Sequence, residues 1–145
     1  MTDQLRTEME ERAALFRVLA DRFGCEVLKA VAEHTARQVE VRLQRADLPR
    51  RNLDAVMELL WNQMDEGMAF DVIERSSERL ELRVTKCVFA EMMRSLDAQD
   101  IGNAFYCAYD EGFCRGLNPA IRFTRTQTLM AGDSCCDHTY ELKGG

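Results

Sequence analysis

Apolar side chains recur every three or four positions along residues 1–66, the spacing that places them on one face of a helix. Thr2 is a favourable N-cap residue, and Gly24 and Gly67 are favourable residues for ending a helix. We expect a polar interruption of the second helix at His34 and Thr35. The predicted helices span residues 2–24, 25–48 and 50–66.

From Met68 onward, the helical period gives way to the alternation of apolar and polar residues that is typical of β-strands. A polar turn at residues 75–78 separates two alternating runs, which predicts a first hairpin. A helical pattern then returns, and Thr85 is its expected N-cap. The expected strands span residues 69–74 and 80–85, and the expected helices span 85–96 and 100–115.

The last part of the chain, residues 121–142, alternates again on both sides of a turn predicted at residues 131–134. In its second strand, alternation places four residues on one face, which the apolar pair Tyr140 and Leu142 marks as buried. The other two residues of this face are Cys136 and His138. A thiol and an imidazole are therefore expected on the interior side of the last strand.

The predicted order of elements, ααα-ββ-αα-ββ, indicates an α+β fold in which N-terminal helices pack with an antiparallel sheet of about four strands. We expect the two hairpins to pair edge to edge. The 145 residues have the length of one domain. Within it, residues 1–66 are the helical part and residues 67–145 are the α+β part that carries the candidate site.

The net charge of −6 argues against nucleic acid and anionic membrane surfaces as partners. The charged N-terminus lacks the apolar run of a signal peptide or a membrane anchor. We therefore expect a cytoplasmic protein whose partner is a small molecule. The apolar stripe of the first helix could serve a homo-oligomer interface as easily as a core.

Six cysteines are the most unusual feature of the composition. In a reducing compartment, cysteines are expected as free thiols, metal ligands or catalytic groups rather than as disulfides. No pair has the CxxC spacing of a zinc ribbon. The six are Cys25, Cys87, Cys107, Cys114, Cys135 and Cys136.

Cys107, Asp110 and Cys114 stand at i, i+3 and i+7 of the helix predicted at residues 100–115, roughly opposite its apolar stripe. Either this helix is packed between two layers, or the three residues line a polar pocket. Cys87 is expected in the first turn of the preceding helix, where free backbone amides favour a thiolate. The alternative for Cys87 is a buried thiol that only packs.

Cys87, Cys107, Cys136 and His138 together offer the sulfur and nitrogen ligands that zinc prefers. They are therefore candidate ligands of a divalent metal such as zinc, although a lone histidine on a buried face is also typical of a hydrogen-bonded core residue. Arg125 shares the face of apolar residues in the predicted strand, so it needs a carboxylate partner. Asp110, Asp133 or the acid group of a ligand could be that partner.

Three segments, TKCVFAEMMR, FYCAYDEGFCRGLNP and FTRTQTLMAGDSCCDHTYE, occur in this order at residues 85–94, 105–119 and 123–141. Taken together, they resemble the L-2-amino-thiazoline-4-carboxylic acid hydrolase family. The helical N-terminal half is similar to this family only in general character. The motif positions present in this sequence are Cys87, Cys107, Asp110, Asn118, Pro119, Gly132, Asp133, Cys136 and His138.

The resemblance implies a hydrolase that opens a cyclic amidine, 2-amino-thiazoline-4-carboxylate, to a carbamoyl-cysteine. Such a reaction needs a base, an acid and an anchor for the substrate carboxylate. The thiols would be metal ligands or nucleophiles. The candidate catalytic residues are Cys87, Cys107, Asp110, Asp133, Cys136 and His138, and the candidate substrate-binding residues are Arg125, Asn118 and Tyr106.

A non-catalytic domain is the alternative interpretation, in which a cysteine-lined pocket binds a small molecule or a metal without turnover. A third interpretation treats the thiols as core residues of a structural protein.

Overall fold

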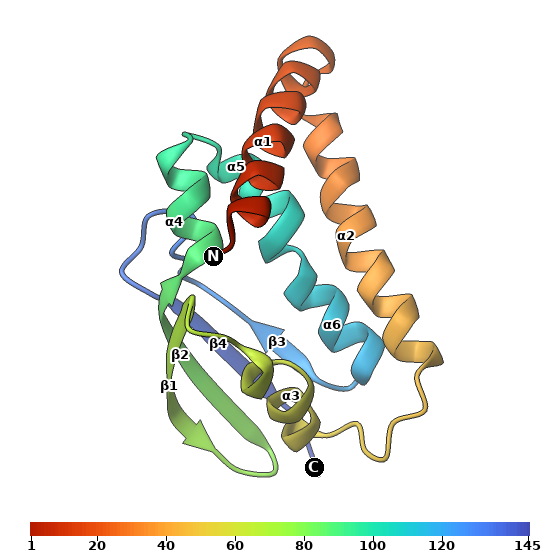
Figure 1. Cartoon of the computed structure of the whole chain (residues 1–145). Helices are drawn as coiled ribbons and strands as arrows, with labels where there is room; N and C mark the ends of the chain where they lie inside the picture. The colour runs from red at the N-terminus through yellow and green to blue at the C-terminus, as the bar shows by residue number, and fades with distance from the viewer.

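A computed structural model describes residues 1–145, and its first half is helical (Figure 1). The Thr2 hydroxyl caps the first helix by accepting a hydrogen bond from the Leu5 backbone N–H. Gly24 ends this helix with a φ of 88°, a backbone conformation that glycine adopts without strain. The helices are α1 (Asp3–Phe23), α2 (Glu26–Arg45) and α3 (Leu53–Leu59), and a 3-10 turn (Trp61–Gln63) follows.

Four antiparallel strands form one sheet in the order β1-β2-β4-β3. The two hairpins pair along β2 and β4, where Leu80 lies opposite Tyr140 and Leu82 opposite His138. Alternating residues of both strands therefore point toward the same face of the sheet. The strands are β1 (Met68–Arg75), β2 (Arg79–Cys87), β3 (Arg122–Thr124) and β4 (Cys136–Glu141).

Between the hairpins, the chain forms α4 (Val88–Ser95), α5 (Gln99–Gly102), a π-helical turn (Asn103–Cys107) and α6 (Tyr109–Leu117). Helix α6 lies beside α2 (Figure 1) because Gly112 and Gly116 let the two backbones approach closely. A Cβ atom on Gly112 would lie 2.1 Å from the carbonyl oxygen of Ala36. This close contact sets the distance between α6 and the N-terminal helices.

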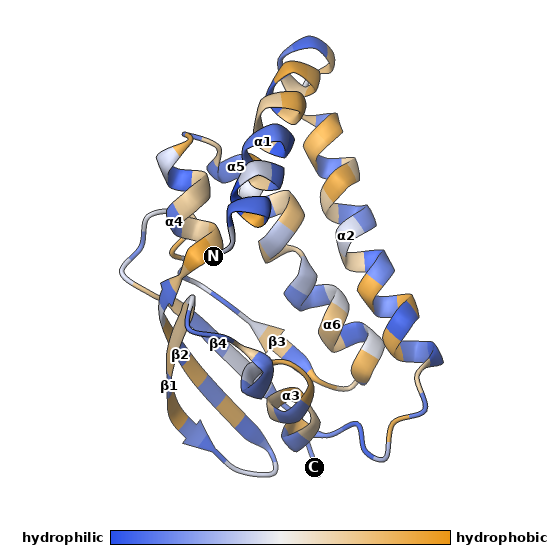
Figure 2. Ribbon diagram, in the orientation of Figure 1, coloured by the Kyte–Doolittle hydropathy of each residue, from blue (hydrophilic) through white to orange (hydrophobic).

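The main core lies between the inner face of the sheet and helices α2, α3 and α6, and it includes the fully buried Leu80, Phe113 and Tyr140. A second cluster, around Met9 and Met93, joins α1 to α4 and α5. Hydrophobic and hydrophilic residues alternate along β2 (Figure 2), in agreement with one buried and one exposed face. None of the helices has the length and apolar character that crossing a membrane requires.

The predicted fold class, α+β with a four-stranded antiparallel sheet, is confirmed, as is the pairing of the two hairpins. Two predictions about the N-terminal helices are wrong. Helix α2 continues through His34 and Thr35, and the Thr35 hydroxyl donates to the Val31 carbonyl one turn earlier in the same helix. Helix α3 is shorter than predicted, because Asn52 caps it at the start and the backbone tightens into the 3-10 turn after Leu60.

Two predictions about the C-terminal part are also wrong. Thr85 does not cap a helix but lies in β2, where its hydroxyl bonds to the Ala69 carbonyl across the hairpin. The last hairpin is not closed by a tight turn at residues 131–134. β3 ends at Thr124, residues 125–135 connect it to β4, and the hydrogen-bonded turn of this connection runs from Leu129 to Gly132. Asp137 holds the start of this segment by accepting hydrogen bonds from the backbone N–H groups of Thr126 and Gln127 at 2.8 and 2.6 Å.

Candidate active site

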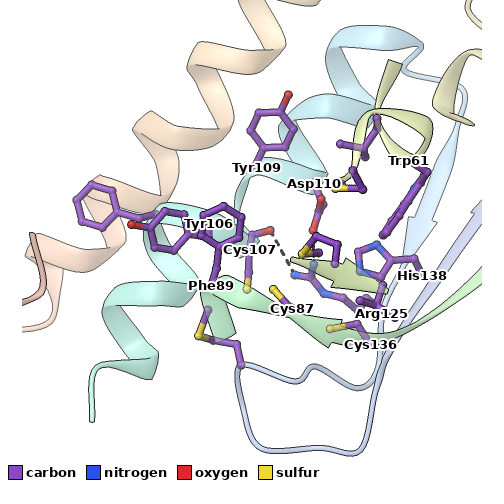
Figure 3. Close-up of a pocket in the computed structure, with 16 residues that line it drawn as sticks. Trp61, Cys87, Phe89, Tyr106, Cys107, Tyr109, Asp110, Arg125, Cys136 and His138 are labelled. Carbon is purple, nitrogen blue, oxygen red and sulfur yellow. Dashed lines mark hydrogen bonds and ion pairs between the residues drawn. The ribbon is translucent and has the colours of Figure 1, made fainter. Parts of the chain in front are cut away.

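A cavity of about 310 Å³ lies between the inner face of the sheet, the π-helical turn and the start of α6 (Figure 3). Its volume falls in the range of small-molecule sites, roughly 300–1,000 Å³. Thirteen of its sixteen lining residues are hydrophobic, and the other three are Asp110, Arg125 and His138. The cavity therefore combines apolar walls with one carboxyl group, one guanidinium group and one imidazole.

Asp110 and Arg125 form an ion pair in the wall of the cavity, with 2.6 Å between Oδ2 and Nη1. Their side chains are 17% and 14% exposed, so the pair is largely removed from water. Burial raises the pKa of Asp110 to about 6, while the charge and the hydrogen bond of Arg125 act in the opposite direction. This carboxyl group can therefore exchange a proton near neutral pH.

The second oxygen of Asp110 is available to a ligand. All fully buried polar side-chain atoms have a hydrogen-bond partner within the protein. Oδ1 of Asp110 has no such partner, so it is open to the cavity that Asp110 lines. Arg125 is held by the Asp110 bond, by a 3.5 Å bond to the Cys107 carbonyl, and by the ring of Phe123, whose centroid lies 5.5 Å from the guanidinium carbon.

The π-helical turn positions the acid and one of the thiols. A π-helical turn inserts one extra residue into a helix and changes the direction of the side chains that follow. Here it ends at Cys107, three residues before Asp110, and both side chains line the cavity. Cys114 lies further along α6 in the main core. The helix is therefore packed between two layers, and two of the three residues also line a cavity, which is mostly apolar rather than polar.

His138 is buried beneath the cavity, with 4% of its surface exposed. Its Nδ1 lies 3.3 Å from the Tyr140 hydroxyl, which also accepts a hydrogen bond from Nε1 of Trp61 at 3.1 Å. The indole of Trp61 packs edge-on against the imidazole, with ring centroids 4.9 Å apart. Burial, followed by the nearby charge of Arg125, lowers the pKa of His138 to about 3, so the imidazole is neutral near pH 7.

Cys87, Cys107 and Cys136 reach the same space from the end of β2, the π-helical turn and the start of β4 (Figure 3). Burial raises the pKa of all three thiols, that of Cys107 to about 12. Of the two interpretations of Cys87, this direction favours the buried thiol over the thiolate. Cys87 occupies the N-cap of α4, and its contacts with the Phe89 and Ala90 backbone lower its pKa, but burial outweighs them.

The four predicted metal ligands do not form a metal site. No group of three or more His, Cys, Asp or Glu side chains has an arrangement that could hold a metal ion. Nδ1 of His138 is already engaged with Tyr140.

Tyr106 lines the cavity as predicted, but only with its ring, which stacks on Phe89 at 4.7 Å between centroids. Its hydroxyl accepts a hydrogen bond from Arg12 of α1. A substrate would therefore meet an aromatic surface at this position.

Asn118 and Asp133 do not line the cavity, contrary to the predicted roles. The Asn118 side chain bridges the Arg51 carbonyl and the Ala120 N–H, both at 2.9 Å, and so fixes the end of α6. Asp133 is exposed, and its carboxylate accepts a hydrogen bond from the Thr128 N–H. Both residues satisfy nearby backbone groups, which is a common use of Asn and Asp in loops.

The family model for L-2-amino-thiazoline-4-carboxylic acid hydrolase matches residues 4–140 of this sequence. The chain belongs to this family. Among curated proteins, none matches it. The match to the hydrolase family includes the helical N-terminal part, where the sequence alone showed only a general likeness.

Sequence reasoning missed Trp61, which the structure places in the wall of the cavity and in contact with His138. The signal was its position beside, rather than within, the apolar stripe of the third helix. It also missed Met64, Met68 and Met130, which line the cavity. Methionines are usual core residues, so no local pattern distinguishes these three.

Proposed function

We propose that the protein is a hydrolase that opens a cyclic amidine such as L-2-amino-thiazoline-4-carboxylate to a carbamoyl-cysteine. The observation that carries this proposal is the buried pair of Asp110 and Arg125 inside an otherwise apolar cavity. The substrate bears a basic amidine and a carboxylate, so an acid and a guanidinium side by side are complementary to its two polar ends. Membership of the hydrolase family supports the same assignment.

Opening the ring adds one water molecule across the bond between C2 and sulfur. The water oxygen bonds to C2 and becomes the carbonyl oxygen of the product, while the C2–S bond breaks. One of the two water protons ends on the ring nitrogen N3, and the other ends on the sulfur, which leaves as a thiol. In this proposal, Asp110 is ionised above its pKa of about 6 and takes a proton from the attacking water. It returns that proton to the sulfur as the bond breaks, so one carboxyl group serves both steps.

Arg125 is assigned to the substrate carboxylate, because its planar guanidinium has N–H groups beyond those that bond to Asp110 and Cys107. His138, a candidate catalytic residue from the sequence, is assigned a role other than that of the acid. With a pKa of about 3, it carries no proton that it could donate as an imidazolium near neutral pH. The protonated thiols Cys87 and Cys136 are assigned to the wall that excludes water from the reaction.

Turnover of L-2-amino-thiazoline-4-carboxylate by the full chain tests the proposal. The new thiol is measured with a chromogenic reagent after the protein is removed by filtration, and the carbamoyl-cysteine is identified by mass spectrometry. Asp110→Asn should lower kcat by about 100-fold or more, the usual effect of losing a general base. Asp133→Asn is the matched control, since that carboxylate is exposed and outside the cavity. Equal rates in the two variants would contradict the role of Asp110.

One observation favours a second function, the binding of a larger ligand without turnover. Thirteen of sixteen lining residues are hydrophobic, which is more apolar surface than a small zwitterion can use. An apolar carboxylic acid would place its tail on this surface and its acid group on Arg125. Native mass spectrometry of the purified protein would detect such a bound acid. A bound acid, together with the absence of turnover, would favour this second function.

A further inference from the structure

The hydrogen bonds around Tyr140 fix the position of a proton on His138. Tyr140 is completely buried, and the only partners of its hydroxyl are Nε1 of Trp61 and Nδ1 of His138. An indole N–H can only donate, so the Tyr140 oxygen accepts from Trp61. The hydroxyl proton then has a single acceptor within reach, which is Nδ1 of His138.

The alternative arrangement leaves a buried donor without a partner. If Nδ1 of His138 carried the proton, both neighbours would donate to the Tyr140 oxygen, and the hydroxyl proton would point at no acceptor. Buried hydroxyl groups are rarely left in this state. The imidazole is therefore held with Nδ1 unprotonated and with its proton on Nε2.

Nε2 of His138 is open to the cavity. It has no hydrogen-bond partner within the protein, although all fully buried polar side-chain atoms have one. His138 also lines the cavity directly (Figure 3). An N–H group thus faces the ligand space beside the pair of Asp110 and Arg125.

We infer that His138 is a neutral hydrogen-bond donor to the ligand, and that Trp61 and Tyr140 are positioning residues that hold its Nε2–H tautomer. This inference rests on the proposed function for the identity of the acceptor. In that reaction, the acceptor is the ring nitrogen N3, which gains the electron pair of the C2=N3 bond as water adds to C2. A fixed donor aimed at an atom that gains charge stabilises the transition state more than the ground state.

The tautomer can be observed directly, because the chain contains only two histidines, His34 and His138. Long-range proton–nitrogen NMR spectra of ¹⁵N-labelled protein show which ring nitrogen carries a proton, and His34→Gln assigns the signals. We expect His138 to have a protonated Nε2 and an unprotonated Nδ1. A protonated Nδ1 in the wild-type protein would overturn the inference.

Tyr140→Phe tests the positioning role. Without the hydroxyl, Nδ1 loses its donor, and we expect the His138 signals to move toward a mixture of tautomers. The matched control is Tyr109→Phe, which removes a hydroxyl bonded to Arg42 from a ring that lines the same cavity. If Tyr140→Phe fails to fold, Trp61→Phe removes the other member of the chain. Unchanged His138 signals in a folded variant would refute the positioning role.

Kinetics test the donor role. His138→Leu removes the N–H group and should lower kcat by about 100-fold, in line with the loss of one donor at an atom that gains charge in the transition state. His138→Gln keeps a side-chain N–H in a similar place and should recover part of that loss. Equal kcat values for His138→Leu and the wild type would refute the donor role. If the wild type itself shows no turnover, the proposed function fails, and the NMR result still decides whether His138 is a held donor.

Discussion

Asp110→Asn should change how the stability of the protein depends on pH. The carboxyl group of Asp110 is buried beside Arg125, and burial raises its pKa to about 6, compared with 3.8 for an ordinary aspartate. The folded state therefore binds this proton more tightly than the unfolded state does. Acidification favours the folded state through this residue, which is the opposite of the usual effect of an aspartate in an exposed ion pair.

The size of the effect follows from the two pKa values. One pKa unit corresponds to about 1.4 kcal/mol, so ionised Asp110 costs the folded state about 3 kcal/mol relative to protonated Asp110. The stabilisation of the folded state by protonated Asp110 is complete below pH 3.8, and it is lost as the pH rises through about 6. Between pH 4 and pH 7, the change amounts to about 2–3 kcal/mol.

Urea unfolding of the wild type and of Asp110→Asn at several pH values measures this difference. Asparagine does not titrate, and arginine side chains are charged at any pH in this range, so the loss of the ion pair adds only a constant offset. The free energy of unfolding of the wild type should rise relative to the variant by about 2–3 kcal/mol as the pH falls from 7 to 4. Asp133→Asn should show no such trend. A flat difference, or one of opposite sign, would mean that Arg125 rather than burial controls the pKa of Asp110.

Three further predictions follow from the contacts described above. Gly112→Ala should lower the free energy of unfolding by more than about 2 kcal/mol, because the added Cβ would overlap the α2 backbone. Urea unfolding measures this change, and Glu111→Ala, at an exposed neighbouring position, should have little effect. Alkylation at neutral pH, mapped by mass spectrometry, should modify the exposed Cys25 well before Cys107, whose pKa burial raises to about 12. If Asp110 is the base, kcat/KM should rise with pH through about 6 and then level off, and a rate that falls over this range would contradict that role.

The fold class could be predicted because its evidence is local. The repeat of apolar residues in α1 and the alternation in β4 each identify one element, and capping by Thr2 marks a boundary. The errors arose where a contact distant in sequence decides the structure. Thr85 has the chemistry of an N-cap, yet the pairing of β2 with β1 keeps it in a strand.

The candidate site could be predicted in part. Alternation along the last strand predicted that Cys136 and His138 point toward the interior. In the structure, both side chains line the cavity. The partner of Arg125 could not be chosen between Asp110 and Asp133 from spacing. That choice depends on the position of α6 relative to β3, which the glycine contacts of α6 with α2 help to set.

The sulfur-rich wall of the cavity has a physical role that requires no thiolate. Burial alone would raise the pKa of Asp110 further, and Arg125 alone would lower it below that of an ordinary aspartate. A value near neutrality needs both the guanidinium and a wall that excludes water. Cysteine provides such a wall as a small hydrophobic residue, and Cys87 and Cys107 line the same cavity as Asp110 in this form. The number of cysteines in the sequence suggested metal or nucleophilic chemistry, whereas in the structure their protonated thiols fit a site whose proton transfer depends on Asp110.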